Sequence, residues 1–213
     1  MNEAVLPLFP LQSVLFPDGH LALRIFEPRY LDMIGRCHRN GEPFGVVALT
    51  GGSEVRRLDP ADGGGFQRER FEPIGTLARI EQLERPQPGL LQIRCRGGQR
   101  FRLTHSECLS HGLWVGRHEP IAADPAVPVP DDLRPVVRLL QGLLHKLEMG
   151  AAASEMPVQP PYRWDDAGWL ANRWAELLPL RSGERQRLMQ LDNPLVRLEL
   201  VNDQLDRLDT GPA

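Results

Sequence analysis

A short segment near the middle of the chain contains the residue types that bind zinc. It reads HSECLSHGLWVGRH and includes His105, Cys108, His111 and His118. Thiolates and imidazoles are the usual zinc ligands, but a structural zinc site is usually signalled by paired CxxC spacing, which is missing here. His105 and Cys108 are also an odd number of residues apart, so on a strand they would point to opposite faces. We therefore predict ordinary strand and turn residues, with no metal and no other cofactor.

Other catalytic chemistries are also disfavoured by residue type and spacing. Cys37 and His38 are neighbours on a predicted helix, where consecutive side chains do not face each other, so Cys37 should pack as a small apolar residue. The single lysine of the chain, Lys146, is followed by leucine within a leucine-rich segment. The sequence has neither a GxxxxGK[ST] phosphate-binding loop nor a GxSxG nucleophile elbow. These observations predict that the protein is not an enzyme.

Basic residues on one predicted strand pair raise the alternative of RNA or DNA binding. The net charge of −3 provides no overall positive field. Few aromatic residues lie among the arginines, and nearby glutamates can offset their charge across strands. Nucleic-acid binding is therefore kept only as an alternative; its candidate residues are Arg94, Arg96, Arg100 and Arg102, opposed by Glu81, Glu84 and Glu107.

A different candidate site lies where a predicted strand runs directly into a predicted helix, in the segment RIFEPRY. Several rings gather near this end of the chain, and most should be core: Phe9, Phe16, Phe26, Tyr30 and Phe44. Glu27 and Arg29 fall in the first turn of the helix, so we expect both to be accessible at the surface. We call Phe26, Glu27, Arg29 and Tyr30 the corner.

The elements that position this corner are mostly strands. Apolar and alternating patterns predict strands over residues 44–50, 74–84, 90–104 and 113–119. A hairpin turn is expected within 84–90, a glycine bulge at 97–99, and a mobile loop over 59–70. Pro28 begins the helix that Asn40-Gly41 ends. The earlier prolines, Pro7, Pro10 and Pro17, suit turns and edge strands, where a missing N–H is harmless.

The second half of the chain is predicted to be helical. A proline-rich connector over 120–131 separates a β-rich part, 1–119, from a helical part, 132–213. Leucine patterns predict four helices with short connections, forming a bundle, with 151–163 as a loop. The predicted helices span 131–150, 165–179, 182–192 and 193–209, and the last three begin at the caps Asp165, Ser182 and Asn193.

Composition places the chain among globular proteins of a reducing compartment. Hydrophobic residues make up 41% and charged residues 25%, and the three cysteines do not suggest a disulfide framework. No leader-like segment and no apolar run of about 18 residues occurs. We expect a cytoplasmic protein without a membrane span.

Several of these segments, taken in order, resemble one family. LPLFPLQSVLFPDGHLALRIFEPRYLDMI, then FGVV, then IGTLARIEQLERPQPGLLQIRCRGGQRFRL are similar to the N-terminal substrate-recognition domain of the Lon protease. The later segment WLANRWAELLPLRSGERQRLMQLDNPLVRLELV resembles the helical part of the same domain. The resemblance extends from about Leu6 to Leu208.

This resemblance implies an α+β fold: a β-rich pseudo-barrel of the PUA-like type with one helix, followed by a helical bundle. It implies a stand-alone recognition protein without ATPase or peptidase parts, such as an adaptor or regulator of proteolysis, and it supplies no catalytic residue. The implied partners are unfolded or degron-bearing polypeptides or a protease, with nucleic acid disfavoured. The corner residues Phe26, Glu27, Arg29 and Tyr30 are the expected polypeptide-binding site.

Overall fold

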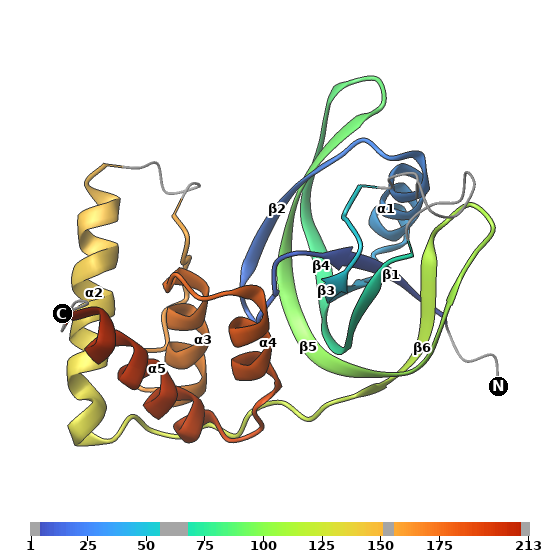
Figure 1. Ribbon diagram of the computed structural model, residues 1–213. Helices are drawn as coiled ribbons and strands as arrows, with labels where there is room; N and C mark the ends of the chain where they lie inside the picture. Colours follow the sequence, from blue (N-terminus) through green and yellow to red (C-terminus); the bar gives the residue numbers. More distant parts are fainter. Residues whose placement is uncertain (1–4, 56–67, 151–155, 210–213) are drawn as a thin grey trace. The chain divides into compact units, whose positions relative to one another are not determined.

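Six strands in the first part of the chain form one sheet that closes into a ring (Figure 1). This arrangement is seen in a computed structural model, which describes residues 5–55, 68–150 and 156–209. The chain divides into two units, Met1–Ala123 and Asp124–Ala213. The predicted loop at 59–70 falls mostly outside the described residues, as does the beginning of the one at 151–163.

The strands of the first unit are β1 Leu6–Leu11, β2 His20–Ile25, β3 Phe44–Gly51, β4 Arg70–Gln87, β5 Leu90–Cys108 and β6 Trp114–Pro120. Their order in the sheet is β2-β5-β4-β3-β1-β6, and a further pairing of β5 with β6 closes the ring. The predicted strands are all present, and the predicted pseudo-barrel is confirmed.

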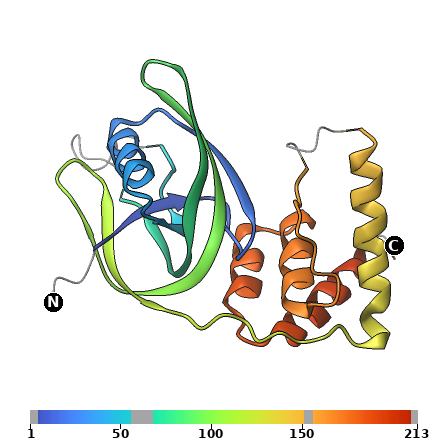
Figure 2. The same ribbon diagram turned by 180° about the vertical axis from the view of Figure 1, so that it is seen from behind.

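The length of β5 makes the closure possible. Its first half, Leu91 to Arg96, pairs with β2, and its second half, Phe101 to Cys108, pairs with β6. Both views show β4 and β5 as long, curved strands that end together in one projecting hairpin (Figures 1 and 2). The predicted turn of this hairpin is confirmed, with Gly89 at a φ of 76°.

A bulge at the predicted glycines bends this strand pair. The β4–β5 register shifts between Thr76 and Ala78, opposite Gly97. The requirement for glycine here comes from a close approach, because a Cβ on Gly97 would lie 2.1 Å from the carbonyl oxygen of Phe16. The amide of Gly97 also donates to the carbonyl of Gly19, and its carbonyl accepts from Asp18. The bulge therefore joins β5 to the turn before β2.

The prediction that the early prolines lie in edge strands is wrong for β1, which lies between β3 and β6. Two of these prolines are nevertheless tolerated, because the two halves of β1 use different partners. β6 pairs with Leu6 and Pro7, whereas the parallel strand β3 pairs with Leu8 to Leu11, including Pro10. Each half is locally edge-like, so an absent N–H need not break a ladder.

Helix α1, Pro28–Asn40, packs against the sheet and carries the candidate site. It begins at Pro28, and Gly41 ends it in the left-handed conformation with a φ of 67°, as the sequence predicts. Its buried face contributes Tyr30, Met33, Ile34 and Cys37 to the main core. That core also contains strand residues, among them Phe9, Phe44, Ile93 and Cys95.

The second unit consists of helices, as predicted. They are a short 3-10 helix η1 Asp131–Leu133, then α2 Arg134–Glu148, α3 Ala167–Leu177, α4 Ser182–Gln190 and α5 Pro194–Asp209. Asn193 caps α5 through its side-chain oxygen, as predicted. Two other caps were predicted wrongly: Asp166 rather than Asp165 caps α3, and Arg181 rather than Ser182 precedes α4.

The leucine patterns predict that Leu139 and Leu208 lie on the buried faces of their helices, and both predictions are wrong. Leu140 and Leu144 of α2 are buried, but Leu139 is 55% exposed, and Leu208 of α5 is 54% exposed. A buried arginine that the sequence does not reveal also joins several segments of the unit. Arg197 of α5 donates to Asp124, to Asn172 of α3 and to the carbonyl of Leu188 of α4.

Candidate functional site

The corner between β2 and α1 presents one exposed ring above a buried polar network. Phe26 is 56% exposed, although most of the other rings at this end of the chain are core. The expectation that Glu27 and Arg29 are both accessible is wrong for Arg29, which is 6% exposed, and Tyr30 is 2% exposed. Glu27 is half-buried. Of the four predicted residues, Phe26 is the one available for a large apolar contact.

The buried side chain of Arg29 forms hydrogen bonds with four segments of the first unit. Its guanidinium donates to Glu27 at 3.0 Å, to Glu69 at 2.8 Å and to the carbonyl of Gly112 at 2.8 Å. A longer hydrogen bond of 3.4 Å reaches the carbonyl of Glu54. Arginine can do this because its planar group offers five donors in fixed directions. The geometry makes Arg29 the buried member of the corner, where it positions Glu27 and the start of α1.

Glu69 is the buried counter-charge of Arg29. Trp114 of β6 donates its indole N–H to the second carboxylate oxygen of Glu69 at 3.1 Å. Burial by itself would raise the pKa of Glu69, but the hydrogen bonds from Arg29 and Trp114 outweigh it and hold that pKa below its ordinary value. Glu69 is therefore ionised near neutral pH, and the pair is complete.

Tyr30 supports the corner from within the core. Its ring stacks on Phe9, with the centroids 4.0 Å apart, and the Arg29 guanidinium carbon lies 4.5 Å from the Tyr30 centroid. Burial raises the pKa of the Tyr30 hydroxyl. A small cavity of about 80 Å³ adjoins these rings, with Phe26, Leu23 and Val55 in its lining. Phe26 thus lies at the edge of an apolar surface.

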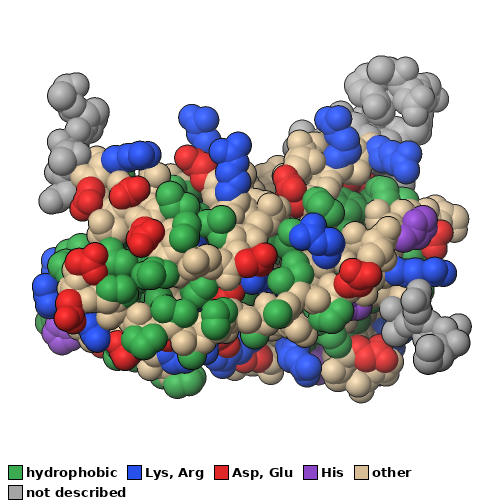
Figure 3. Space-filling model, turned by 90° about the horizontal axis from the view of Figure 1, so that it is seen from below, with side chains coloured by type: hydrophobic (Ala, Val, Ile, Leu, Met, Phe, Trp, Pro, Cys, Tyr) green, Lys and Arg blue, Asp and Glu red, His purple; other side chains and the backbone are tan. Residues whose placement is uncertain are grey.

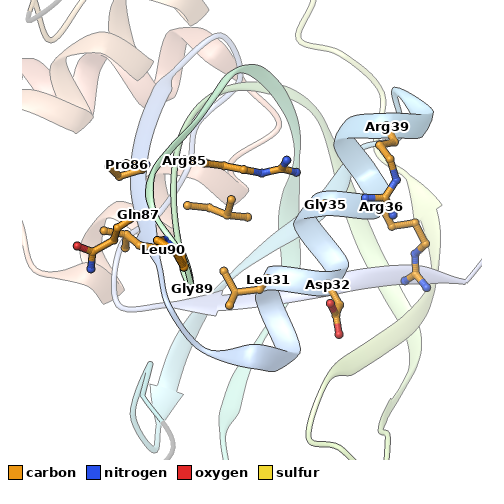
Figure 4. Close-up of a pocket in the computed structure, with 12 residues that line it drawn as sticks. Leu31, Asp32, Gly35, Arg36, Arg39, Arg85, Pro86, Gln87, Gly89 and Leu90 are labelled. Carbon is orange, nitrogen blue, oxygen red and sulfur yellow. The ribbon is translucent and has the colours of Figure 1, made fainter.

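A larger groove lies between α1 and the β4–β5 hairpin (Figure 4). Its volume is about 850 Å³, which is within the range of ligand pockets, about 300 to 1,000 Å³. Leu31 points from α1 toward the hairpin, and Arg85 extends from the hairpin toward α1 (Figure 4). The groove is not among the sites predicted from the sequence, although Arg36 and Arg39 at helical spacing and the RPQPG turn are signals of it.

The groove and the corner are neighbours along one strand pair. Leu91, which lines the groove, is the partner of Ile25 in the β2–β5 ladder, and Phe26 follows Ile25 directly. Leu31, also in the groove, lies one residue after Tyr30. A ligand in the groove would therefore be close to the exposed ring at the corner.

The metal and thiol chemistries that the sequence raises are not assembled by the residues that the structure describes. Within the described residues, no group of three or more His, Cys, Asp or Glu side chains is placed to hold a metal ion. Cys37 is buried beside Met33, as expected of a packing residue, and burial raises its pKa. Burial also raises the pKa of Cys95 to about 12, which leaves its thiol protonated.

The arginines of β5 do not form one free basic surface. Arg100 is buried at 4% exposure, and Arg96 pairs with Asp18 at 3.2 Å. On the face of each unit that Figure 3 displays, basic and acidic side chains are interspersed with hydrophobic ones. The described residues on that face therefore form no continuous track of positive charge, which phosphate binding needs.

Fold and site together define a class. A ring-closed sheet with one helix precedes a helical unit in the chain, and the candidate site is a surface groove beside an exposed ring rather than a cluster of reactive side chains. The chain belongs to the family described as the ATP-dependent protease La (LON) substrate-binding domain, which matches residues 5–207. These 213 residues are thus a Lon substrate-binding domain and contain neither the ATPase nor the protease domain of Lon.

Two curated proteins are similar in sequence. A LON peptidase N-terminal domain and RING finger protein of Schizosaccharomyces pombe is 28% identical over 225 residues, covering 94% of this chain and 44% of that protein. Lon protease 1 of Bdellovibrio bacteriovorus is 31% identical over 101 residues, covering 47% of this chain and 12% of that protein. The chain spans less than half the length of the curated relatives it matches.

Two solved structures share the fold. A Lon N-terminal domain protein from Xanthomonas campestris is 32% identical, with a TM-score of 0.68 over 94% of this chain and 98% of that one. The N-terminal domain of a Mycobacterium avium complex Lon protease has a TM-score of 0.58 over 95% of this chain and 98% of that one. At 14% identity, the second shows the fold alone.

No helix in the described part of the chain is long and apolar enough to cross a membrane.

Proposed function

We propose that this protein binds unfolded or degron-bearing polypeptides at the corner and performs no catalysis itself. The observation that carries the proposal is the match of a protease substrate-binding domain to residues 5–207. The exposed ring of Phe26 supports the proposed location, because aromatic side chains with exposed apolar area are frequent anchors of binding sites.

The four corner residues have different parts in this proposal. Phe26 contacts an apolar side chain of the client, and half-buried Glu27 offers a carboxylate beside it. Arg29 and Tyr30 hold Glu27 and the start of α1 in place from below. The role of Arg29 is thus positioning, instead of the direct orientation of the client that its place in the sequence suggests.

The cellular role follows from binding without processing. A recognition domain can deliver clients to a protease, compete with that protease for them, or hold them unfolded, so the protein acts as an adaptor or regulator of proteolysis. The sparse cysteines support a cytoplasmic location. Residues 120–131 serve as the connector between a recognition unit, 1–119, and a helical unit, 132–213.

The test compares Phe26→Ser with a matched control, Leu200→Ser. Leu200 is 41% exposed and lies on α5 in the other unit. Binding of a reduced and alkylated, permanently unfolded polypeptide would be measured by fluorescence anisotropy. Covering the exposed half of a phenylalanine contributes about 1 to 1.5 kcal/mol, so Phe26→Ser should weaken binding about five- to tenfold.

The control defines what counts against the proposal. Leu200→Ser should bind the client as the wild type does. Equal losses of affinity in both variants would show that the unfolded polypeptide binds nonspecifically to exposed apolar side chains. If wild type binds no unfolded polypeptide more tightly than a folded globular protein does, the proposed function is wrong.

A further inference from the structure

The groove between α1 and the β4–β5 hairpin is predominantly basic. Arg36 and Arg39 line it from α1, and Arg85 lines it from the hairpin, whereas Asp32 is the one acidic side chain among the described residues of the lining. All three arginines are exposed. Among the described residues, no carboxylate forms an ion pair or hydrogen bond with any of them. Their positive charge is therefore available to a ligand.

The floor of the groove is apolar and has room for a side chain. Leu31 from α1 and Leu90 and Leu91 from β5 supply apolar surface. Gly35 lies on the side of α1 that lines the groove (Figure 4). A Cβ on Gly35 would meet, within 4 Å, only the guanidinium end of Arg39, at 3.4 Å. The absence of a side chain here leaves space between the helix and the hairpin.

We propose that this groove binds an acidic stretch of the client, with apolar side chains on the floor and Asp or Glu side chains against Arg39 and Arg85. This inference rests on the proposed function and adds to it a preference for acidic, leucine-containing segments. Charge complementarity selects this occupant, since three guanidiniums without a carboxylate partner among the described residues face one carboxylate in the lining. Guanidinium–carboxylate pairs also favour a defined geometry, because the two planar groups match.

The composition of the groove favours a polypeptide over a nucleic acid. Single-stranded nucleic acids bind on aromatic side chains that stack with their bases, and the described residues that line this groove include no aromatic ring. The net charge of −3 also opposes long polyanions. A short acidic peptide needs only the local cluster of arginines.

The experiment uses the full chain and two short fluorescent peptides. One alternates leucine with glutamate, and the other alternates leucine with glutamine, so that they differ in charge but hardly in shape. At low ionic strength the wild type should bind the glutamate peptide about five- to tenfold more tightly, since each exposed pair contributes a modest amount. High salt should remove most of this preference.

Matched variants assign the preference to the groove. Arg39→Gln/Arg85→Gln should lose it, and the control Arg187→Gln, an exposed change on α4 in the other unit, should keep it. A steric pair adds a test that does not depend on charge. Gly35→Met should weaken binding of both peptides by filling the floor, whereas Gly35→Ala should leave binding nearly unchanged. Thermal melting followed by circular dichroism checks that each variant is folded.

The outcomes separate this inference from the proposed function. Equal affinity for the two peptides, or a preference that survives Arg39→Gln/Arg85→Gln, overturns the groove assignment. If Phe26→Ser still weakens binding of the unfolded polypeptide in that case, the proposed function stands alone. A single-stranded RNA that binds through Arg39 and Arg85 while the acidic peptide does not would also overturn the assignment. If no polypeptide binds, both proposals are wrong.

Discussion

Replacing Arg29 with methionine should destabilise the first unit far more than an ordinary surface substitution. Methionine preserves much of the apolar length but removes the donors to Glu27, Glu69 and the carbonyl of Gly112. Glu69, which is 7% exposed, would keep Trp114 as its side-chain donor but lose its positive partner. The variant thus leaves a buried carboxylate without a counter-charge.

The expected magnitude follows from that uncompensated charge. Removing one partner of a buried ion pair costs about 3 to 5 kcal/mol, whereas substitutions at exposed sites usually stay within about 0.5 kcal/mol. Glu69→Gln should cost less than Arg29→Met, because Arg29 would keep the Glu27 carboxylate at 3.0 Å as a counter-charge, whereas Glu69 in Arg29→Met loses its cationic partner. The double variant should be more stable than the sum of the two losses predicts, by about 2 kcal/mol, because its two sites share one network.

Hydrogen exchange measured by mass spectrometry is the suitable assay, because it resolves the two units within one chain. Peptides from β4 and β5 should exchange much faster in Arg29→Met than in the wild type. Peptides from α3 and α5 provide an internal comparison in the same sample. A loss below about 1 kcal/mol in β4 and β5, or strictly additive effects in the double variant, would refute the reasoning about the buried network.

The contribution of Glu69 to stability should change in opposite directions on acidification in the wild type and in Arg29→Met. In the wild type the pKa of Glu69 lies below its ordinary value. Glu69 therefore contributes stability above the unfolded carboxyl pKa, about 4.3, and this contribution is lost as the pH falls through the lower folded pKa. In Arg29→Met, burial without the cation should raise that pKa, so acidification should stabilise the variant. The difference between the two proteins should shrink as the pH falls from 7 toward about 4.

Three further outcomes test other parts of the fold. Gly97→Ala should prevent stable folding of the first unit, because its Cβ would lie 2.1 Å from the Phe16 carbonyl oxygen. The loss would be measured as soluble yield and by circular dichroism, and a variant as stable as the wild type would contradict the prediction. Asn193→Ala should lower the stability of the helical unit by about 1 kcal/mol in urea unfolding, through loss of the α5 cap, and no change would show the cap to be dispensable. When the folded protein is alkylated at mildly alkaline pH, exposed Cys108 should react first. Buried Cys95 should react slowly, since burial raises the pKa of Cys95 to about 12. Equal alkylation rates for the two cysteines would argue against the burial of Cys95.

Local signals in the sequence predict where the elements lie and how several of them begin and end. Pro28 and Gly41 bound α1, and Asn193 begins α5, because these residues act through their own backbone and nearest neighbours. The failures are also local in scale. The sequence predicts caps at Asp165 and Ser182, whereas the caps are the adjacent residues Asp166 and Arg181. Only the backbone conformation decides between neighbouring positions.

At the candidate site, by contrast, the sequence does not predict which side chains are buried. The sequence predicts that Phe26, Glu27, Arg29 and Tyr30 share one corner, but it treats Arg29 as a surface residue because arginine is rarely buried. Its partners Glu69 and Gly112 are 40 and 83 residues away along the chain. The basic groove is not predictable from the sequence for the same reason, since Arg39 and Arg85 come from segments that only the folded hairpin and helix bring together.

The sequence by itself therefore determined the fold class, the order of strands and helices, the glycine bulge of β5 and the family, because these depend on local backbone preferences and on patterns read along the chain. The tertiary structure decided how β5 and β6 close the ring, which face of α2 is buried and which corner residue remains exposed. It alone assembled the groove from α1 and the β4–β5 hairpin. These features depend on contacts between residues far apart in sequence, whose partners no local pattern specifies.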